Sequence, residues 1–252
     1  MTRFKDRVLL LTGAGSGIGR ATALKLAAEG ASIFISDIVP EALEETVKLA
    51  QEVADDDAQI EARVCDISDE EQAENSVAAC VEHFGRLDTL CNNAGVLGYQ
   101  NTHEMSLAFW RRILSVNLDG AFLMTREAIP HLLETRGSIV NIGSTAGLSG
   151  LAYGSAYSAS KGAIHAFTRA VAVEYADRGL RANSISPASI ETGMTKPTPM
   201  PEGANLALFQ RLTSLHGVAE PGAVADLVLF LASDAAHHIS GEEIRIDGAA
   251  LA

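Results

Sequence analysis

Short apolar runs recur along the chain, and stretches with helical periodicity separate them. Continuous apolar runs of this length are typical of strands that are covered on both faces, as in a parallel sheet. The alternation of the two kinds of segment predicts an α/β fold. The expected strands span residues 8–11, 31–36, 60–64, 87–91, 138–142, 181–186 and 244–247.

The intervals between these strands carry the expected helices. A capping box at Ser68 to Glu71 predicts that the third helix begins at Ser68. The stretch 110–134 reads as one long helix with apolar residues almost all round, which indicates burial on more than one side and a subunit interface. The other expected helices span about 18–29, 40–54, 206–212 and 221–232, and one more carries residues 157–161 and runs to about 177.

The net charge and the length of the apolar runs argue against several classes of binding partner. The formal net charge of −13 argues against nucleic acid and anionic membrane surfaces as partners. No apolar run approaches the ~18 residues that a membrane span requires, and the short apolar run near the N-terminus has no cleavage-like site. Because no linker, repeat or low-complexity segment divides residues 1–252, we expect one domain.

The cysteines and histidines predict neither disulfides nor a metal site. Three cysteines leave one unpaired under any scheme, so Cys65, Cys80 and Cys91 are expected to be buried thiols in a cytoplasmic protein. His237 and His238 are adjacent, and adjacent side chains point in different directions. With no other Cys/His spacing of the usual kind, we expect no metal.

A glycine-rich turn follows the first strand directly and precedes the first helix. The segment 12–19 reads TGAGSGIG, with the spacing Gly13-x-x-x-Gly17-x-Gly19. Glycines let the backbone approach an anion, and a helix N-terminus offers free N–H groups and a positive dipole end. The arrangement favours binding of a pyrophosphate. It is neither the usual G-x-G-x-x-G register nor a Walker loop.

Two aspartates follow strand ends on the same side of the predicted sheet. Asp37 stands where a dinucleotide site places the acid that binds both hydroxyls of the adenosine ribose. It would repel a 2′-phosphate, and neither Ile38 nor Ser16 is basic, so we expect NAD(H) rather than NADP(H). The alternative is a turn or helix-capping aspartate before Pro40. Asp66 is either an adenine contact or a plain loop aspartate.

Polar residues also follow the fourth and fifth expected strands. The segment 92–95 reads NNAG, which suits a backbone that passes close to a ligand. Ser144 follows the fifth strand, where open α/β sheets place their chemistry. Asn117 is a lone amide in an apolar helix, and it either faces solvent or has a functional role with buried partners.

Tyr157 and Lys161 lie four residues apart in an expected helix, so their side chains share one face. A phenol has a pKa of ~10 in water. A lysine ammonium close by favours the phenolate, so we expect Lys161 to lower the pKa of Tyr157 and make it a proton acceptor. Taken alone, the pattern favours a surface pair of residues; its context in the rest of the chain favours catalysis.

The segment of about 188–217 has no strong periodicity apart from 206–212. A loop of this length is usually functional, and its apolar side chains suit a lid over an apolar ligand. The alternative is a poorly ordered surface loop, which predicts fewer large apolar side chains. The loop's large apolar residues are Met194, Met200, Leu206, Leu208, Phe209 and Leu212. The rest of the expected apolar pocket is Val96, Leu97, Tyr99, Leu148, Leu151 and Tyr153.

Together, the segments 12–19 and 92–95 with Ser144, Tyr157 and Lys161 resemble the short-chain dehydrogenase/reductase family over essentially the whole chain. The resemblance implies one doubly wound, Rossmann-like domain with a seven-stranded parallel sheet, helices on both faces, and assembly as a tetramer or dimer. It implies that Tyr157 is the acid/base, that Lys161 lowers its pKa and binds the nicotinamide ribose, and that Ser144 holds the substrate oxygen.

The resemblance further implies that Asn117 positions a water in a proton relay and that Thr192 holds the carboxamide of the cofactor. The full set of cofactor contacts that it implies is Gly13, Ser16, Gly17, Ile18, Gly19, Asp37, Asp66, Ile67, Asn93, Ala94, Gly95, Tyr157, Lys161, Pro187, Ile190 and Thr192. Two departures from the family pattern are Ala188 and Ala249, where the family commonly has glycine.

These observations predict an NAD-dependent oxidoreductase that interconverts an apolar secondary alcohol, whether cyclic, aliphatic or steroid-like, and its ketone. A second hypothesis is a 3-oxoacyl-thioester reductase that acts on acyl carrier protein. A third is a non-catalytic NAD-binding sensor or scaffold, which predicts erosion of Ser144, Tyr157 or Lys161; all three are present.

Overall fold

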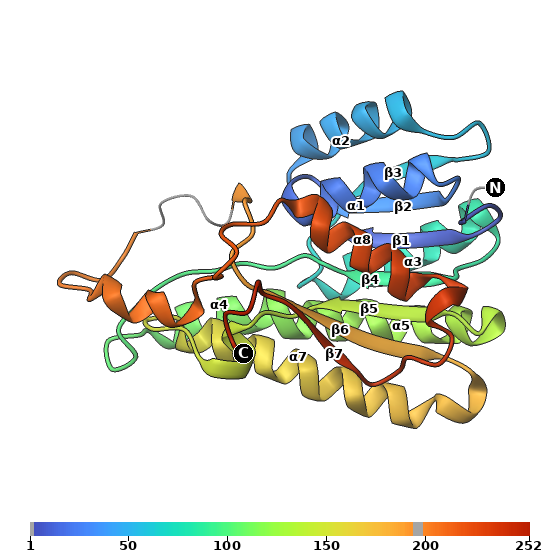
Figure 1. Cartoon of the computed structure of the whole chain (residues 1–252). Helices are drawn as coiled ribbons and strands as arrows, with labels where there is room; N and C mark the ends of the chain where they lie inside the picture. Colours follow the sequence, from blue (N-terminus) through green and yellow to red (C-terminus); the bar gives the residue numbers. More distant parts are fainter. Residues whose placement is uncertain (1–2, 194–198) are drawn as a thin grey trace.

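A computed structural model describes residues 3–193 and 199–252, and within them seven strands form one parallel sheet (Figure 1). Their order is β3-β2-β1-β4-β5-β6-β7, so the winding direction reverses between β1 and β4, where such folds bind ligands. The predicted doubly wound fold is confirmed. The strands are β1 (Val8–Thr12), β2 (Ser32–Asp37), β3 (Ile60–Val64), β4 (Thr89–Asn92), β5 (Ser138–Ile142), β6 (Arg181–Pro187) and β7 (Glu243–Ile246).

Three long helices cover each face of the sheet. Helices α1 (Gly17–Ala28), α2 (Pro40–Val53) and α8 (Pro221–Ala232) pack on one face, and α3 (Glu70–Phe84), α5 (Gly120–Thr135) and α7 (Ser155–Glu174) pack on the other. The strand residues alternate between the two cores. In β1, Leu9 and Leu11 join the first core while Val8 and Leu10 join the second. Burial on both faces is why this strand reads as an unbroken apolar run.

Two expected helix boundaries are wrong. The N-cap of α3 is Asp69 rather than Ser68, because the Asp69 side chain accepts a hydrogen bond from the backbone N–H of Gln72 at 3.0 Å. The helix expected over 110–134 begins earlier, as α4 (Leu107–Leu114), and changes to a π-helical turn, η1 (Ser115–Asp119), before it continues as α5. Ser106 caps α4 by accepting from the N–H of Phe109.

The apolar loop after β6 is anchored near both of its ends. Ile190 pairs with Ala219 as an isolated parallel bridge, and the N–H of Leu215 donates to the carbonyl of Gly248 at 2.9 Å. Between these anchors, η4 (Leu206–Leu212) forms a short 3₁₀ helix. Met194 falls in 194–198, outside the described residues. The C-terminal turn thus holds the far end of the loop.

Ala249 occupies a backbone conformation that favours glycine, with φ at 66°. A non-glycine residue in this region costs about 1–2 kcal/mol. We therefore expect Ala249→Gly to raise the free energy of unfolding by about 1 kcal/mol, after allowance for the greater chain entropy of glycine. Urea denaturation measures this change.

The matched control is Gly248→Ala, because Gly248 also has a positive φ and a Cβ there would lie 2.0 Å from the hydroxyl of Ser214. This variant should lose stability. A lower stability for Ala249→Gly would contradict the strain that we assign to Ala249.

The three cysteines are all buried free thiols. Burial raises the pKa of Cys80 and of Cys91 to about 12, so both are inert thiols at neutral pH. Across the part of the chain that the structure describes, the helices lack the combination of length and apolar character that a membrane crossing needs.

Candidate active site

A cleft of about 820 Å³ opens where the carboxyl ends of β1, β2, β4, β5 and β6 meet. It collects all of the sequence-predicted site residues except two. Gly19 and Asn117 are the exceptions, and both lie directly behind the lining. The lining also contains residues that sequence reasoning did not select, among them Ile38, Cys65, Arg112, Val116, Thr145 and Ala146.

The glycine turn leaves its backbone open to a ligand. Gly13 and Gly17 both have positive φ, and a Cβ at Gly13 would lie 2.6 Å from the Cα of Ala94. The first turn of α1 contains no acidic residue, and Ser16 makes no side-chain capping bond. Its backbone N–H groups are therefore available to an anion. Gly19 has a different task, because a Cβ there would meet the carbonyl oxygen of Gly13 at 2.1 Å.

Hydrogen bonds from Asn93 and to Thr12 hold the backbone of the glycine turn in place. The Asn93 amide donates to the carbonyls of Thr12 at 3.0 Å and Gly13 at 2.9 Å. In return, the Thr12 hydroxyl accepts from the backbone N–H groups of Asn93 and Ala94, each at 3.1 Å. Sequence reasoning did not select Thr12 as a site residue, although it is the first residue of the segment 12–19. Its only signal is that it joins the strand to the glycine motif.

Asp37 both shapes the turn and faces the cleft. Its carboxylate accepts from the N–H of Gly15 at 2.8 Å and of Val39 at 3.0 Å, so the turn-aspartate interpretation also holds. One nearby cation was not anticipated. Arg20 donates to the carbonyl of Gly15 at 2.6 Å, but the same guanidinium nitrogen also pairs with Glu45 at 2.6 Å. Arg20 is therefore paired with a carboxylate of its own.

Asp66 lies in the cleft beside Ile67 at the end of the segment that follows β3. One of its carboxylate oxygens accepts from the backbone N–H of Ser68 at 3.0 Å and from the Ser68 hydroxyl at 2.6 Å. This turn fixes the side chain while leaving it on the cleft wall. Both sequence interpretations, loop aspartate and ligand contact, are compatible with that position.

Ser144, Tyr157 and Lys161 meet on one wall of the cleft. β5 ends at Ile142 and presents Ser144, while α7 presents Tyr157 and Lys161 one turn apart. Tyr157 is hydrogen-bonded to Ser144. The Lys161 ammonium donates to the carbonyl of Ile142 at 2.7 Å and lies 5.8 Å from the centre of the Tyr157 ring. Helix and strand thus bring the three predicted side chains together.

The expected sign of the Tyr157 shift is wrong for the chain by itself. Burial raises the pKa of Tyr157 to about 12, and only the hydrogen bond with Ser144 opposes this rise. Burial likewise lowers the pKa of Lys161 to about 8. The ammonium is directed at the Ile142 carbonyl rather than at the phenol, so desolvation dominates both groups. The chain alone holds a protonated phenol at neutral pH.

Asn117 sits in the π-helical turn and is 2% exposed, so the solvent-facing interpretation is wrong. Its amide oxygen accepts from the N–H of Val96 at 2.7 Å, and its nitrogen donates to the Val96 carbonyl at 2.9 Å and to the Ser160 hydroxyl at 3.1 Å. A Cβ at Gly95 would lie 3.2 Å from the amide oxygen and 3.5 Å from the Lys161 ammonium. Asn117 therefore joins the cleft wall to α7 beside Lys161.

The part of the cleft next to Tyr157 is mainly apolar. Tyr157 packs in a cluster with Ile113, Ala146 and Ala156. The expected residues Leu148 and Tyr153 are not in the lining; Leu148 is exposed, and Tyr153 stacks on Phe209 from outside. Arg112 adds a charged side chain to the same lining. The apolar side chains that do line the cleft here are Val96, Leu97, Tyr99, Leu151, Phe209 and Leu212.

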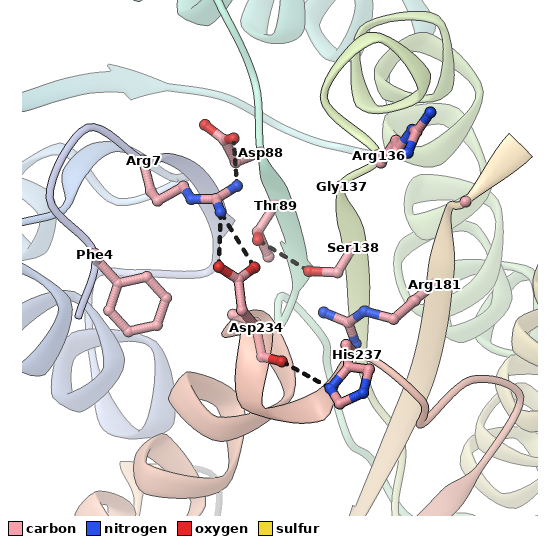
Figure 2. Close-up of a pocket in the computed structure, with 12 residues that line it drawn as sticks. Phe4, Arg7, Asp88, Thr89, Arg136, Gly137, Ser138, Arg181, Asp234 and His237 are labelled. Carbon is pink, nitrogen blue, oxygen red and sulfur yellow. Dashed lines mark hydrogen bonds and ion pairs between the residues drawn. The ribbon is translucent and has the colours of Figure 1, made fainter.

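A second cavity, of about 140 Å³, lies at the opposite edge of the sheet, where β4, β5 and β6 begin (Figure 2). Three of its charged residues, Arg7, Asp88 and Asp234, form linked ion pairs. Arg7 donates to Asp88 at 3.2 Å and to both carboxylate oxygens of Asp234, as Figure 2 shows. Arg86 donates to both oxygens of Asp88. We interpret this cavity as a structural ion-pair network.

Asp88→Asn should cost about 2–3 kcal/mol of folding free energy, since the side chain of Asp88 is only 3% exposed, Arg86 loses its charged acceptor and Arg7 loses one of two. The control is Asp234→Asn, which removes a carboxylate from the same Arg7 but at a side chain that is 89% exposed. That change should cost less than about 1 kcal/mol. Urea midpoints measure both, and equal losses would contradict the dominant role of Asp88.

Comparisons with known proteins agree with one another. A family model described as Enoyl-(Acyl carrier protein) reductase matches residues 13–249. Levodione reductase of Leifsonia aquatica is 39% identical over 254 residues, which cover 98% of this chain and 95% of that protein. Meso-2,3-butanediol dehydrogenase of Serratia marcescens is 39% identical over 250 residues, covering 99% and 96%. The 3-oxoacyl-(acyl-carrier-protein) reductase of Thermotoga maritima is 37% identical over 247 residues, covering 98% of each.

Solved structures give the same picture. The crystal structure of levodione reductase superposes with a TM-score of 0.89 at 38% identity and covers 98% of both chains. A short chain dehydrogenase from Mycobacterium paratuberculosis, crystallised with NAD, superposes with a TM-score of 0.89 at 31% identity and covers 98% of both chains.

Proposed function

The chain belongs to the short-chain dehydrogenase/reductase family and is an oxidoreductase, and we propose that it interconverts an apolar secondary alcohol and its ketone with NAD as cofactor. The observation that carries the proposal is the grouping of Ser144, Tyr157 and Lys161 on one wall of the cleft, in the same cleft as the glycine turn and Asp37.

The residues present fit a dinucleotide. The uncapped first turn of α1 and the open glycine backbone suit the pyrophosphate, and Asp37 at the cleft edge suits the adenosine ribose. Asp66 suits the adenine, and Asn93, Pro187 and Thr192 line the same cleft as Tyr157. With a carboxylate at position 37, a ribose 2′-hydroxyl is favoured over a 2′-phosphate. This supports NAD over NADP.

The chemistry assigned to the chain is proton transfer and positioning. When bound, NAD+ would supply the hydride acceptor and a positively charged ring. Ser144 and Tyr157 hold the substrate oxygen by hydrogen bonds. During oxidation the Tyr157 phenolate takes the hydroxyl proton, and during reduction the phenol returns a proton to the carbonyl oxygen. Lys161 binds the nicotinamide ribose and stabilises the phenolate, while Asn117 supports a proton relay next to it.

An apolar substrate is supported by the side chains around Tyr157, and alcohol–ketone chemistry is supported by the relatives' names. Val96, Leu97, Leu151, Phe209 and Leu212 offer few partners for a polyol. Levodione and 2,3-butanediol, in the names of two relatives, are a ketone and an alcohol. A cyclic, aliphatic or steroid-like secondary alcohol fits this pocket better than a sugar.

The second candidate is a 3-oxoacyl-thioester reductase that acts on acyl carrier protein. The matching family model and the Thermotoga maritima relative favour it. The net charge of −13 is against it, because acyl carrier protein is itself acidic and would be repelled. Asp37 is against it if such reductases use NADPH. A non-catalytic sensor is disfavoured because Ser144, Tyr157 and Lys161 are all present.

A rate screen tests the proposal. NAD+ is offered with cyclic, aliphatic, steroidal and polyol alcohols, and NADH with a 3-oxoacyl thioester, while NADH fluorescence measures cofactor binding separately. Turnover that is fastest with an apolar secondary alcohol is the expected result. Fastest turnover with the thioester would support the second candidate, and cofactor binding without any turnover would support the sensor.

We also propose that the protein is a cytoplasmic homo-oligomer, with a tetramer favoured over a dimer. Figure 1 places α5 and α7 side by side on the outer surface, where Phe122 contacts Phe167 edge to face. Phe122 on α5 and Val173 on α7 remain 45% and 79% exposed. Light scattering on the purified chain measures the assembly. The three buried free thiols suit a reducing compartment.

A further inference from the structure

A buried histidine that the proposed reaction does not use lies directly beneath the serine turn. His165 is one helical turn beyond Lys161 on α7 and is 2% exposed. A Cβ on Gly143 would lie 2.2 Å from the Cε1 atom of this ring. The backbone before Ser144 therefore rests on the imidazole, and only glycine fits at position 143 without a shift.

The partners of His165 fix which ring nitrogen carries the hydrogen. Nε2 lies 3.4 Å from the carbonyl oxygen of Ser144, which can only accept. Nε2 also lies 3.2 Å from the Ser186 hydroxyl, whose single hydrogen is donated to the Glu243 carboxylate at 3.2 Å. Toward His165 this hydroxyl can therefore only accept. Both contacts require a hydrogen on Nε2, and Nδ1 is then free to accept from the Ser184 hydroxyl at 3.0 Å.

The charges around the ring favour its neutral form. Burial is the main cause that lowers the pKa of His165, and Lys161 and Arg169 on the same helix lower it further. Glu243 on β7 acts in the opposite direction, as does the hydrogen bond to Ser144. From β6 the ring meets the hydroxyls of Ser184 and Ser186. A neutral imidazole with a defined tautomer is consistent with all of these contacts.

We infer that His165, held as the Nε2–H tautomer by Glu243 through Ser186, is a positioning residue that fixes the Ser144 turn for catalysis. This inference rests on the proposed function of Ser144. The Ser144 hydroxyl already accepts from the N–H of Ala146 at 3.1 Å. The backbone carbonyl of Ser144 lies 3.4 Å from Nε2 of His165. These two contacts, at the side chain and at the carbonyl of Ser144, orient the hydroxyl toward Tyr157. Small misplacements of such groups lower the reaction rate.

The tautomer is tested without any activity measurement. The protein is labelled with ¹⁵N in its histidine rings, and the His165 signals are assigned by their loss in His165→Gln. Ring-nitrogen chemical shifts should report hydrogen on Nε2 of His165 in the wild type. In Glu243→Ala, which frees the Ser186 hydrogen, the Nδ1–H form should increase. A wild-type ring with its hydrogen on Nδ1, or fully protonated at pH 7, would overturn the inference.

The positioning role is tested by kinetics on the best alcohol from the rate screen. His165→Leu should lower kcat about tenfold with NAD+ affinity unchanged, and His165→Gln, which keeps a donor near the Nε2 position, should recover most of that loss. In a Ser144→Ala background, His165→Leu should change kcat less than about twofold, because its effect acts through Ser144.

A loss of the same factor in both backgrounds would overturn the inference, as would a glutamine variant no better than leucine. His103→Leu is the control for an exposed histidine and should leave kcat unchanged. If the wild type turns over no alcohol at all, the proposed function fails, while the ring-nitrogen measurement still decides the geometry of His165.

Discussion

Tyr157→Phe is expected to lower turnover about 10³-fold while changing NAD+ affinity less than about twofold. The substitution removes one oxygen and keeps the ring that packs on Ile113, Ala146 and Ala156. The hydroxyl is the only group that the proposal allows to exchange a proton with the substrate oxygen. Steady-state rates with the best alcohol and NADH fluorescence titration measure the two quantities separately.

The control is Tyr99→Phe, because Tyr99 lines the same cleft and its phenol is also partly desolvated. This variant should keep most of its turnover. In the wild type, oxidation should become faster as pH rises through the neutral range, because burial raises the pKa of Tyr157 and the proton-accepting phenolate gains population with pH. More than a tenth of wild-type turnover in Tyr157→Phe would contradict the role of the phenol.

The strands and their order of appearance could be predicted because burial on both faces leaves a continuous apolar signature. The predicted first and last residues of these elements were less accurate. Strand β4 is Thr89–Asn92 rather than 87–91, since Leu87 is buried before the ladder of hydrogen bonds begins. The π-helical turn at Asn117 was not predictable, because it accompanies bonds to Val96, a residue twenty-one positions earlier in the chain.

The identities of the candidate site residues followed from motifs, but their electrostatics did not. Spacing alone places Lys161 near Tyr157, yet the direction of the tyrosine shift depends on how deeply the phenol is buried and on the Ile142 carbonyl that Lys161 binds. His165 was missed for a related reason. In a helix pattern it is one polar residue on an apolar face, and its partners come from β6 and from the turn after β5, which the local sequence does not reveal.

Asp37→Asn should change the ratio of NAD+ to NADP+ efficiency about a hundredfold in favour of NADP+, equivalent to about 2.7 kcal/mol. The amide keeps one oxygen, which can accept from the N–H of Gly15, while the N–H of Val39 loses its acceptor. What is lost is the negative charge, which strengthens hydrogen bonds from ribose hydroxyls and repels a 2′-phosphate. Values of kcat/KM with each cofactor at fixed alcohol concentration measure the ratio.

The matched control for this change is Asp66→Asn, which makes the same chemical substitution in the same cleft. It should leave the cofactor ratio within about threefold, because the proposal places Asp66 beside adenine rather than the ribose hydroxyls. An unchanged ratio in Asp37→Asn would show that another residue discriminates between NAD+ and NADP+. Arg20 would then be the first residue to test, since its guanidinium reaches the Gly15 carbonyl and only its pairing with Glu45 offsets its charge.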